Sequence, residues 1–320
     1  MNLPEVSFVI PTYNAGKYIE RCLRSIVSQG YPEKAIEIVV IDGGSTDDTL
    51  EICERFNLRL LNNPEKLAEI GQALGIKAAR GDLIVAFAAD NALPTSDWLL
   101  HMIRPFQEHP ELAAAFSLPI ADRKDSAMNR YYCDIKTDPL TFFVFNSFGN
   151  RLRTYKPLIR EDEYDIFIFP KDDCPLVALA QGFVLRKEFV PSSIGLDDVA
   201  PFCDMVSRRL PIAMVRSVGI YHYHLEGLSS FIRKYVFRAR TRLLRSVRRE
   251  GIMNLKARRR MKLWLLYSLS WIFPLVDSVK GYKEDPNLAW FYHPLACFVL
   301  CLIDICVGVA DARKTLGHFK

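Results

Sequence analysis

Three polar loops, each following a short apolar strand, carry the side chains best suited to bind a ligand. The loops are PTYN at residues 11–14, DGGSTDD at 42–48 and AADN at 88–91. The third loop closes the stretch VAFAADN, in which an apolar strand stops at one carboxylate, Asp90. A carboxylate in such a place can hold a divalent cation or accept a hydrogen bond from a ligand.

The elements that must position these loops alternate regularly. Apolar β-branched runs predict strands, and apolar residues at helical spacing predict helices. The predicted strands cover residues 6–10, 37–41, 58–61 and 83–87, and the predicted helices cover 15–28, 47–56, 68–79 and 96–107. Ser45 and Asp48 fit a capping box for the second helix. Four βα units imply an α/β fold with a mostly parallel, Rossmann-like sheet and helices on both faces. Because ligands bind at the carboxyl ends of such strands, we expect the three loops to form one site.

The pattern is less regular after residue 110. A strand is predicted over 113–117, and residues 121–175 mix aromatic and charged side chains, which fits an irregular lobe over a cleft. Further strands are expected over 176–186 and 212–223, with a helix over 204–209 between them.

His222 and His224 alternate in YHYH, so they face the same side if they lie on a strand. Two interpretations stay open. The two imidazoles face the site, or they are ordinary core or surface residues.

The C-terminal part combines a basic run with apolar segments. Thirteen Lys and Arg and one acid, Glu250, lie between residues 233 and 262, on an amphipathic pattern suited to an anionic membrane surface. Apolar runs follow at 263–279 and 288–310, each near the length that spans a bilayer. Basic residues flank both runs, which favours a hairpin with both ends in the cytosol. Two buried helices of a soluble domain are the alternative, and the sequence also leaves open whether the helices span the membrane or lie in its interface.

Composition narrows the class of protein. The chain has 320 residues, half of them hydrophobic, enough for a sizeable core. Its eight cysteines show no CxxC pair or zinc spacing, so reduced cytosolic thiols are expected. No signal peptide is recognised at the N-terminus. The first strand lacks a following GxGxxG, which argues against a dinucleotide-dependent oxidoreductase. The apolar segments beside the basic run argue against nucleic acid as a partner.

The order of these pieces resembles the family-2 glycosyltransferases, inverting sugar-nucleotide enzymes with a GT-A fold. The resemblance rests on VSFVIPTYNAGKYIERCLRSIVSQ, EIVVIDGGSTDDT, GIKAARGDLIVAFAADN and VGIYHYH. The C-terminal helices look like those of the membrane-associated branch, which builds polysaccharides or lipid-linked sugars.

The resemblance implies roles for individual residues. It places the nucleotide against the first two loops and the AADN turn, and the metal, Mg²⁺ or Mn²⁺, on Asp90 with His222 or His224. The implied nucleotide-binding residues are Pro11, Thr12, Tyr13, Asn14, Asp42, Gly43 and Ala89. Asp42 would contact the base, and a turn residue that holds backbone amides is the alternative. The family pattern is Asp-x-Asp, and Ala88 stands here in place of its first acid, which puts strict metal dependence in doubt.

The general base is expected at Asp204, with Asp197 and Asp198 as the second choice. Arg208 and Arg209 would pair with Asp204 or with the donor's diphosphate. Gln181 and Gly182 match the acceptor-side loop.

The sequence therefore predicts a catalytic domain over residues 1–230 and membrane-associated helices over 231–320. The expected activity is transfer of a sugar from a nucleotide-diphosphate donor, a uridine nucleotide in most of the family, to a hydroxyl of a lipid-linked or growing glycan. The reaction would take place at the cytosolic face of the cell membrane. A nucleotide-sugar binding or scaffold protein with impaired catalysis is the alternative.

Overall fold

The computed structural model describes residues 3–136, 138–145, 154–171, 175, 177–195, 198–245, 255–284 and 286–317. These residues form two compact units. The first comprises Met1–Ile120 and Arg153–His222, and the second comprises Ala121–Leu152 and Tyr223–Lys320. The units differ in their bounds from the predicted functional domains, whose division at residue 230 stays a prediction.

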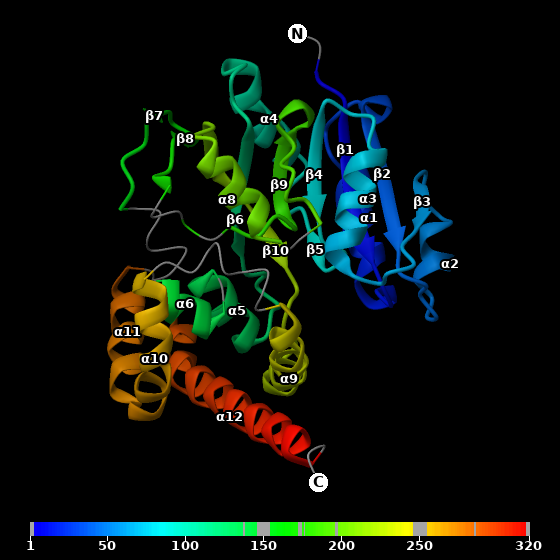
Figure 1. The fold of residues 1–320 in the computed structure, drawn as a ribbon. Coiled ribbons are helices and arrows are strands. Elements are labelled where there is room, and N and C mark those ends of the chain that lie inside the picture. Colours follow the sequence, from blue (N-terminus) through cyan, green and yellow to red (C-terminus); the bar gives the residue numbers. More distant parts are fainter. Residues whose placement is uncertain are drawn as a thin grey trace. The chain divides into compact units, whose positions relative to one another are not determined.

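The first unit is built on one mixed sheet with the strand order β3-β2-β1-β4-β9-β6-β10-β8-β7 (Figure 1). Its strands are β1 (Val6–Thr12), β2 (Ile36–Asp42), β3 (Arg59–Asn62), β4 (Leu83–Phe87), β6 (Ala114–Ile120), β7 (Ile159–Arg160), β8 (Tyr164–Phe167), β9 (Gln181–Arg186) and β10 (Ile212–His222). The strands β3, β2, β1 and β4 are parallel, and β10 is parallel to β6. The mostly parallel α/β sheet is confirmed, with β9 antiparallel between β4 and β6.

Helices cover both faces of this sheet, as predicted. Its helices are α1 (Gly16–Val27), α2 (Thr49–Cys53), α3 (Ala68–Ala78), α4 (Trp98–Glu108) and α8 (Ala200–Ser207), with short 3-10 turns at Glu33–Ala35 and Lys187–Phe189. Phe8 and Ile10 of β1 share a core cluster with buried residues of α1 and α4. Val9 points to the other face, where a Cβ on Gly75 of α3 would lie 2.3 Å from its side chain. Glycine at this position lets α3 lie directly on the sheet.

Helix α2 is shorter than predicted, and the capping box at Ser45 and Asp48 is wrong. Asp48 makes no side-chain cap bond, and the Ser45 hydroxyl instead donates to Asp42 at 2.5 Å. Asp47 accepts from the backbone N–H of Thr49 at 3.1 Å. Ser45, which the capping pattern assigned to the helix, thus bonds within the local turn instead.

The second unit is helical. It contains α5 (Ala127–Ile135), α6 (Pro139–Phe145), α9 (Leu228–Arg245), α10 (Leu255–Ser270), α11 (Ile272–Glu284), a 3-10 helix η5 (Leu288–Tyr292) and α12 (His293–Gly317). Helices α5 and α6 replace part of the irregular lobe expected over 121–175. Ser126 caps α5 by accepting from the N–H of Asn129, and buried Met128, Tyr131 and Tyr132 give it a helical stripe. The aromatic residues in this segment concealed its helical periodicity in the sequence.

The first apolar run is not one continuous helix. It divides at Trp271, whose φ of 58° separates α10 from α11. Within the described part of the chain, only Leu288–Gly308 is long and apolar enough to cross a membrane, with a mean hydropathy of 1.9. Of its best window, 39% is buried within the protein, so a core helix meets the same test. The seven cysteines that the structure describes are free thiols, as expected.

Candidate functional site

The site is centred on the turn that follows β4. Asn91 donates its N–H to the carbonyl of Ala88 at 3.0 Å, which reverses the chain. Strand β5 (Asn91–Ala92) then pairs antiparallel with the end of β10, where Asn91 faces His222. This pairing brings Asp90 Oδ1 to 3.6 Å from His222 Nε2. Two segments far apart in sequence thus present a carboxylate and an imidazole to one point.

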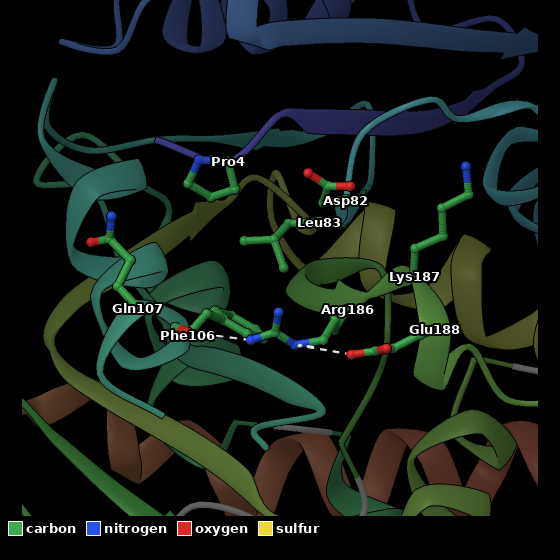
Figure 2. Close-up of a pocket in the computed structure, with 8 residues that line it drawn as sticks. All are labelled: Pro4, Asp82, Leu83, Phe106, Gln107, Arg186, Lys187 and Glu188. Carbon is green, nitrogen blue, oxygen red and sulfur yellow. Dashed lines mark hydrogen bonds and ion pairs between the residues drawn. The ribbon is translucent and has the colours of Figure 1, made fainter. Parts of the chain in front are cut away.

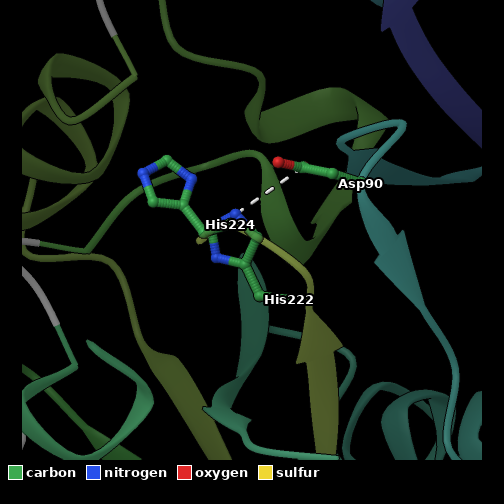
Figure 3. A group of neighbouring side chains, drawn as sticks. All are labelled: Asp90, His222 and His224. Carbon is green, nitrogen blue, oxygen red and sulfur yellow. Dashed lines mark ion pairs between the residues drawn. The ribbon is translucent and has the colours of Figure 1, made fainter. Parts of the chain in front are cut away.

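His224 follows two residues later and completes a group of three candidate ligands (Figure 3). Ligand atoms of Asp90, His222 and His224 all lie within 4.8 Å of one another. Both histidines are buried, and the Asp90 side chain is 23% exposed. His224 stacks on Tyr132 at 4.6 Å, and Lys234 Nζ lies 3.3 Å from its Nδ1. The YHYH alternation left two interpretations open. The structure favours the one in which both imidazoles approach Asp90.

The loops after β1 and β2 are tied to each other. Thr12 and Asp42 are register partners at the ends of these strands. Gly43 donates its N–H to the carbonyl of Thr12 at 2.8 Å, and Asn14 Oδ1 accepts from Thr46 N–H at 2.8 Å. Asn14, at φ 49°, donates its own N–H to the hydroxyl of Ser45. Pro11, Thr12, Tyr13, Asn14, Asp42 and Gly43 therefore lie in one connected polar rim.

The Asp42 carboxylate stabilises the turn that directly follows it. Its carboxylate accepts from the N–H groups of Gly44 and Ser45 at 2.8 and 2.9 Å and from the Ser45 hydroxyl. The interpretation of Asp42 as a turn residue is thus borne out by geometry. Its contact with a base stays a prediction.

Lys66 is a candidate that the sequence analysis missed. Its Nζ lies 5.7 Å from the ring of Tyr13, and a Cβ on Gly44 would lie 3.9 Å from Lys66 Cε. Tyr13 is 51% exposed, so a flat aromatic face and a cation stand together beside the loop of Asp42. No motif marks Lys66, because the turn that carries it, with φ 57° at Lys66, is visible only in three dimensions.

The expected acceptor-side residues lie beside the AADN turn. Gln181 is the register partner of Phe87, the last residue of β4. Asn91 Nδ2 donates to the carbonyl of Ala180 at 2.8 Å, which ties the two segments together. Gly182 adopts φ +76°, and a Cβ there would lie 2.7 Å from Ile220.

Helix α8 carries the expected base. Phe202 anchors this helix against Phe116 of β6 and Phe183 of β9, at ring distances of 6.1 and 6.0 Å. Asp204, two residues later, is half-buried, and it is not part of the group around Asp90.

The other residues of this region are placed as follows. Arg208 and Arg209 are exposed after α8, and Arg208 donates to the carbonyl of Phe189 at 3.3 Å. Asp198 is described, whereas Asp197 lies outside the described residues.

Beneath the AADN turn lies a buried thiol. Burial raises the pKa of Cys22 well above its usual value, and Asp90 adds to this effect. Cys22 therefore stays a neutral thiol under the turn and is not a nucleophile.

A pocket elsewhere in this unit is separate from the site. Figure 2 shows its lining, which includes Asp82, Leu83, Phe106 and Arg186. Asp82 and Leu83 stand at the start of β4, whereas Asp90 follows its end. The Arg186 guanidinium donates to the carbonyls of Leu112 and Phe106, so it ties the end of α4 to the loop before β6.

Comparison with known proteins identifies the family. The family model described as Glycosyl transferase family 2 matches residues 7–170. The chain belongs to this family. A Methanococcus voltae protein is 35% identical over 119 residues, 34% of this chain and 37% of its own length. It is named dolichyl N-acetyl-alpha-D-glucosaminyl phosphate 3-beta-D-2,3-diacetamido-2,3-dideoxy-beta-D-glucuronosyltransferase. Glycosyltransferase AglE of Haloferax volcanii is 37% identical over 103 residues, 30% of this chain and 34% of its own length. The chain spans about a third of the length of these family-2 relatives.

A solved structure has a similar fold. The mannosyltransferase PcManGT from Pyrobaculum calidifontis, in complex with GDP-Man and Mn²⁺, has a TM-score of 0.51 and 14% identity. The alignment covers 94% of this chain and 87% of that one. The similarity supports the GT-A fold expected of this family-2 chain.

Proposed function

We propose that this family-2 chain is an inverting glycosyltransferase that uses a nucleotide-diphosphate sugar. One observation carries the proposal. The carboxyl end of β4 brings Asp90 to 3.6 Å from His222, in the same sheet whose β1 and β2 loops form a connected polar rim. A donor whose nucleoside lies on that rim would place its diphosphate near Asp90.

The three candidate ligands fit a divalent cation. One carboxylate with two imidazoles is a mixed oxygen and nitrogen set, which suits Mn²⁺ better than Mg²⁺, because Mg²⁺ takes oxygen ligands almost exclusively. When bound, the ion would neutralise charge on the leaving nucleoside diphosphate. The two histidines would supply ligands in place of the acid that Ala88 lacks.

Asp204 is our candidate for the general base. It would accept the proton of the acceptor hydroxyl as that oxygen attacks the anomeric carbon and the bond to the diphosphate breaks. Gln181 and Gly182 would border the acceptor, and Arg208 and Arg209 the diphosphate. Asp204→Asn should keep nucleotide affinity and lose transfer activity, whereas unchanged transfer would remove this assignment.

The acceptor is proposed from chemistry and from relatives. The name of the Methanococcus voltae relative includes dolichyl N-acetyl-alpha-D-glucosaminyl phosphate, a sugar linked to a lipid. We propose a hydroxyl of a lipid-linked or growing glycan for this chain, with the reaction at the cytosolic face of the cell membrane. The basic run between residues 233 and 262 supports a location at an anionic lipid surface.

The first experiment is calorimetric titration of the whole protein with UDP, GDP and dTDP, each with and without Mn²⁺. We expect one nucleotide to bind, and Mn²⁺ to strengthen its binding. A nucleotide affinity that is the same with and without Mn²⁺ would assign the diphosphate contact to Arg208 and Arg209. If no nucleotide binds, the donor site proposed here is wrong.

A further inference from the structure

The exposed apolar surface of the second unit is concentrated on one helical hairpin. Helices α10 and α11 pack side by side and are joined at Trp271 (Figure 1). Tyr267 donates a hydrogen bond to Asp277 across the hairpin at 2.8 Å, which fixes the two helices as antiparallel neighbours. Buried Trp264, Tyr267 and Pro274 face inward.

The outward face of this hairpin is apolar, although it meets solvent. Residues 263–276 contain no charged side chain. The side chains around the tip are between 44% and 68% exposed: Leu266, Leu269, Trp271, Ile272, Phe273, Leu275 and Val276. A continuous exposed apolar surface of this kind marks a site for a partner or a membrane.

Charge and aromatic residues at the other end of the hairpin favour a membrane. We define the hairpin base by Arg259, Lys262, Lys280 and Lys283, which are all exposed. Lys262 and Lys280 lie nine residues before and after Trp271. Tyr282 and Phe291, whose rings are 5.8 Å apart, are exposed near the same end. The apolar tip and the base, which carries both aromatic and cationic side chains, follow the order of hydrocarbon core and membrane interface in a lipid leaflet.

The length of the hairpin limits its depth. At about 1.5 Å per helical residue, the tip is about 14 Å from Lys262 and Lys280. Half of a typical hydrocarbon core of about 30 Å is about 15 Å. The hairpin matches one leaflet and is too short to cross two.

We propose that the α10–α11 hairpin docks this protein on an anionic bilayer by inserting Trp271, Ile272 and Phe273 into a single leaflet. This inference favours interfacial helices over a two-span hairpin, a choice that the sequence left open. It deepens the proposed function, because a docked catalytic unit meets lipid-linked acceptors, but the docking requires no substrate.

The test is co-sedimentation of the whole protein with phosphatidylcholine vesicles that contain phosphatidylglycerol. We expect the wild type to sediment, and Ile272→Glu/Phe273→Glu to bind at least about tenfold more weakly. The matched control is Val27→Glu/Leu158→Glu, which changes residues of the first unit with similar exposure, 56% and 63%. This control should bind like the wild type.

Depth is measured with brominated lipids. Bromine in the acyl chains should quench tryptophan fluorescence of the bound wild type, and Trp271→Phe should remove most of that quenching. Three results would overturn the proposal: no vesicle binding, an equal loss in the control, or protease protection of the C-terminal segment on the far side of the vesicle. A wild-type oligomer that Ile272→Glu/Phe273→Glu converts to monomer, without vesicle binding, would make the tip a protein interface.

Nucleotide titration of the same variants separates the two proposals. The hairpin variants should bind nucleotide like the wild type. Vesicle binding without nucleotide binding would reject the donor site and keep the docking surface, and the reverse result would reject only the docking surface.

Discussion

Asp90 is the only carboxylate in the group of candidate ligands, so its charge should decide whether a divalent cation binds. We predict that Asp90→Asn abolishes the Mn²⁺-dependent part of nucleotide affinity, a loss of about tenfold or more. The matched control is Asp82→Asn, an exposed residue at the start of the same strand. Calorimetry with and without Mn²⁺ checks both variants. Equal Mn²⁺ enhancement in Asp90→Asn and the wild type would place the metal elsewhere.

Lys66 offers a cation where the first two loops meet. Its Nζ stands 5.7 Å from the Tyr13 ring, close to the position proposed for the nucleoside diphosphate. We predict that Lys66→Met weakens nucleotide binding about tenfold, because one charge-assisted contact is lost. Lys77→Met, on the exposed face of α3, is the control. A loss that is the same for nucleoside and nucleoside diphosphate would show that Lys66 acts on the base alone.

In strand β9, the backbone conformation of a single glycine bears on both the stability of the fold and the site. Gly182 has φ +76°, and a Cβ there would lie 2.7 Å from Ile220. We predict that Gly182→Ala lowers the free energy of unfolding by about 1–3 kcal/mol and weakens nucleotide binding. Gly308→Ala in α12 meets nothing within 4 Å and should be neutral or stabilising by up to about 1 kcal/mol. Chemical denaturation of both variants measures the contrast, and equal effects would refute the strain argument.

The α10, α11 and α12 helices meet at a buried histidine. Tyr131 OH lies 2.6 Å from His293 Nδ1, and Tyr267 OH lies 3.0 Å from Nε2. Because Tyr267 donates to Asp277, it accepts from Nε2–H, which leaves Nδ1 to accept from Tyr131. The arrangement therefore requires a neutral imidazole. Burial lowers the pKa of His293 from 6.5 to about 4.

This shift has a direct consequence for stability. The unfolded chain binds a proton on His293 at a higher pH than the folded chain, so stability is full above about pH 6.5 and is lost as the pH falls towards 4. The shift corresponds to a loss of roughly 3 kcal/mol. Thermal unfolding of the wild type and His293→Gln between pH 7.5 and 4.5 tests this. His293→Gln should be less stable at pH 7.5 and less sensitive to acid, and parallel pH profiles would contradict the role of His293.

At the scale of elements, the sequence predicted most of the helices and strands that follow local periodicity. It predicted few of the contacts between residues that lie far apart in the chain. The βα units after Val6 and Leu83 follow from local periodicity, and so does the position of Asp90 at a strand end. The 3.6 Å approach of His222 depends on β5 pairing with β10, more than a hundred residues away. Lys66 and the division at Trp271 depend on single left-handed residues, which periodicity does not detect.

The whole molecule has an uneven charge. Its net charge is +5, but residues 233–262 hold thirteen of the 42 Lys and Arg and one of the 37 Asp and Glu. That segment therefore carries +12 and the rest of the chain −7. An anionic surface attracts one segment and repels the remainder, which would orient the protein without any specific lipid contact.

Salt should separate this electrostatic attraction from hairpin insertion. Between about 0.05 M and about 0.5 M NaCl the Debye length falls severalfold, so binding to anionic vesicles should weaken more than tenfold. Insertion of the apolar tip should leave residual binding that salt does not remove. Arg259→Glu/Lys262→Glu should reproduce much of the salt effect at low ionic strength. Lys34→Glu/Lys77→Glu makes the same change of charge on exposed residues of the first unit and should have little effect. If both pairs weaken binding equally, net charge alone draws the protein to the membrane, and the basic segment has no special role.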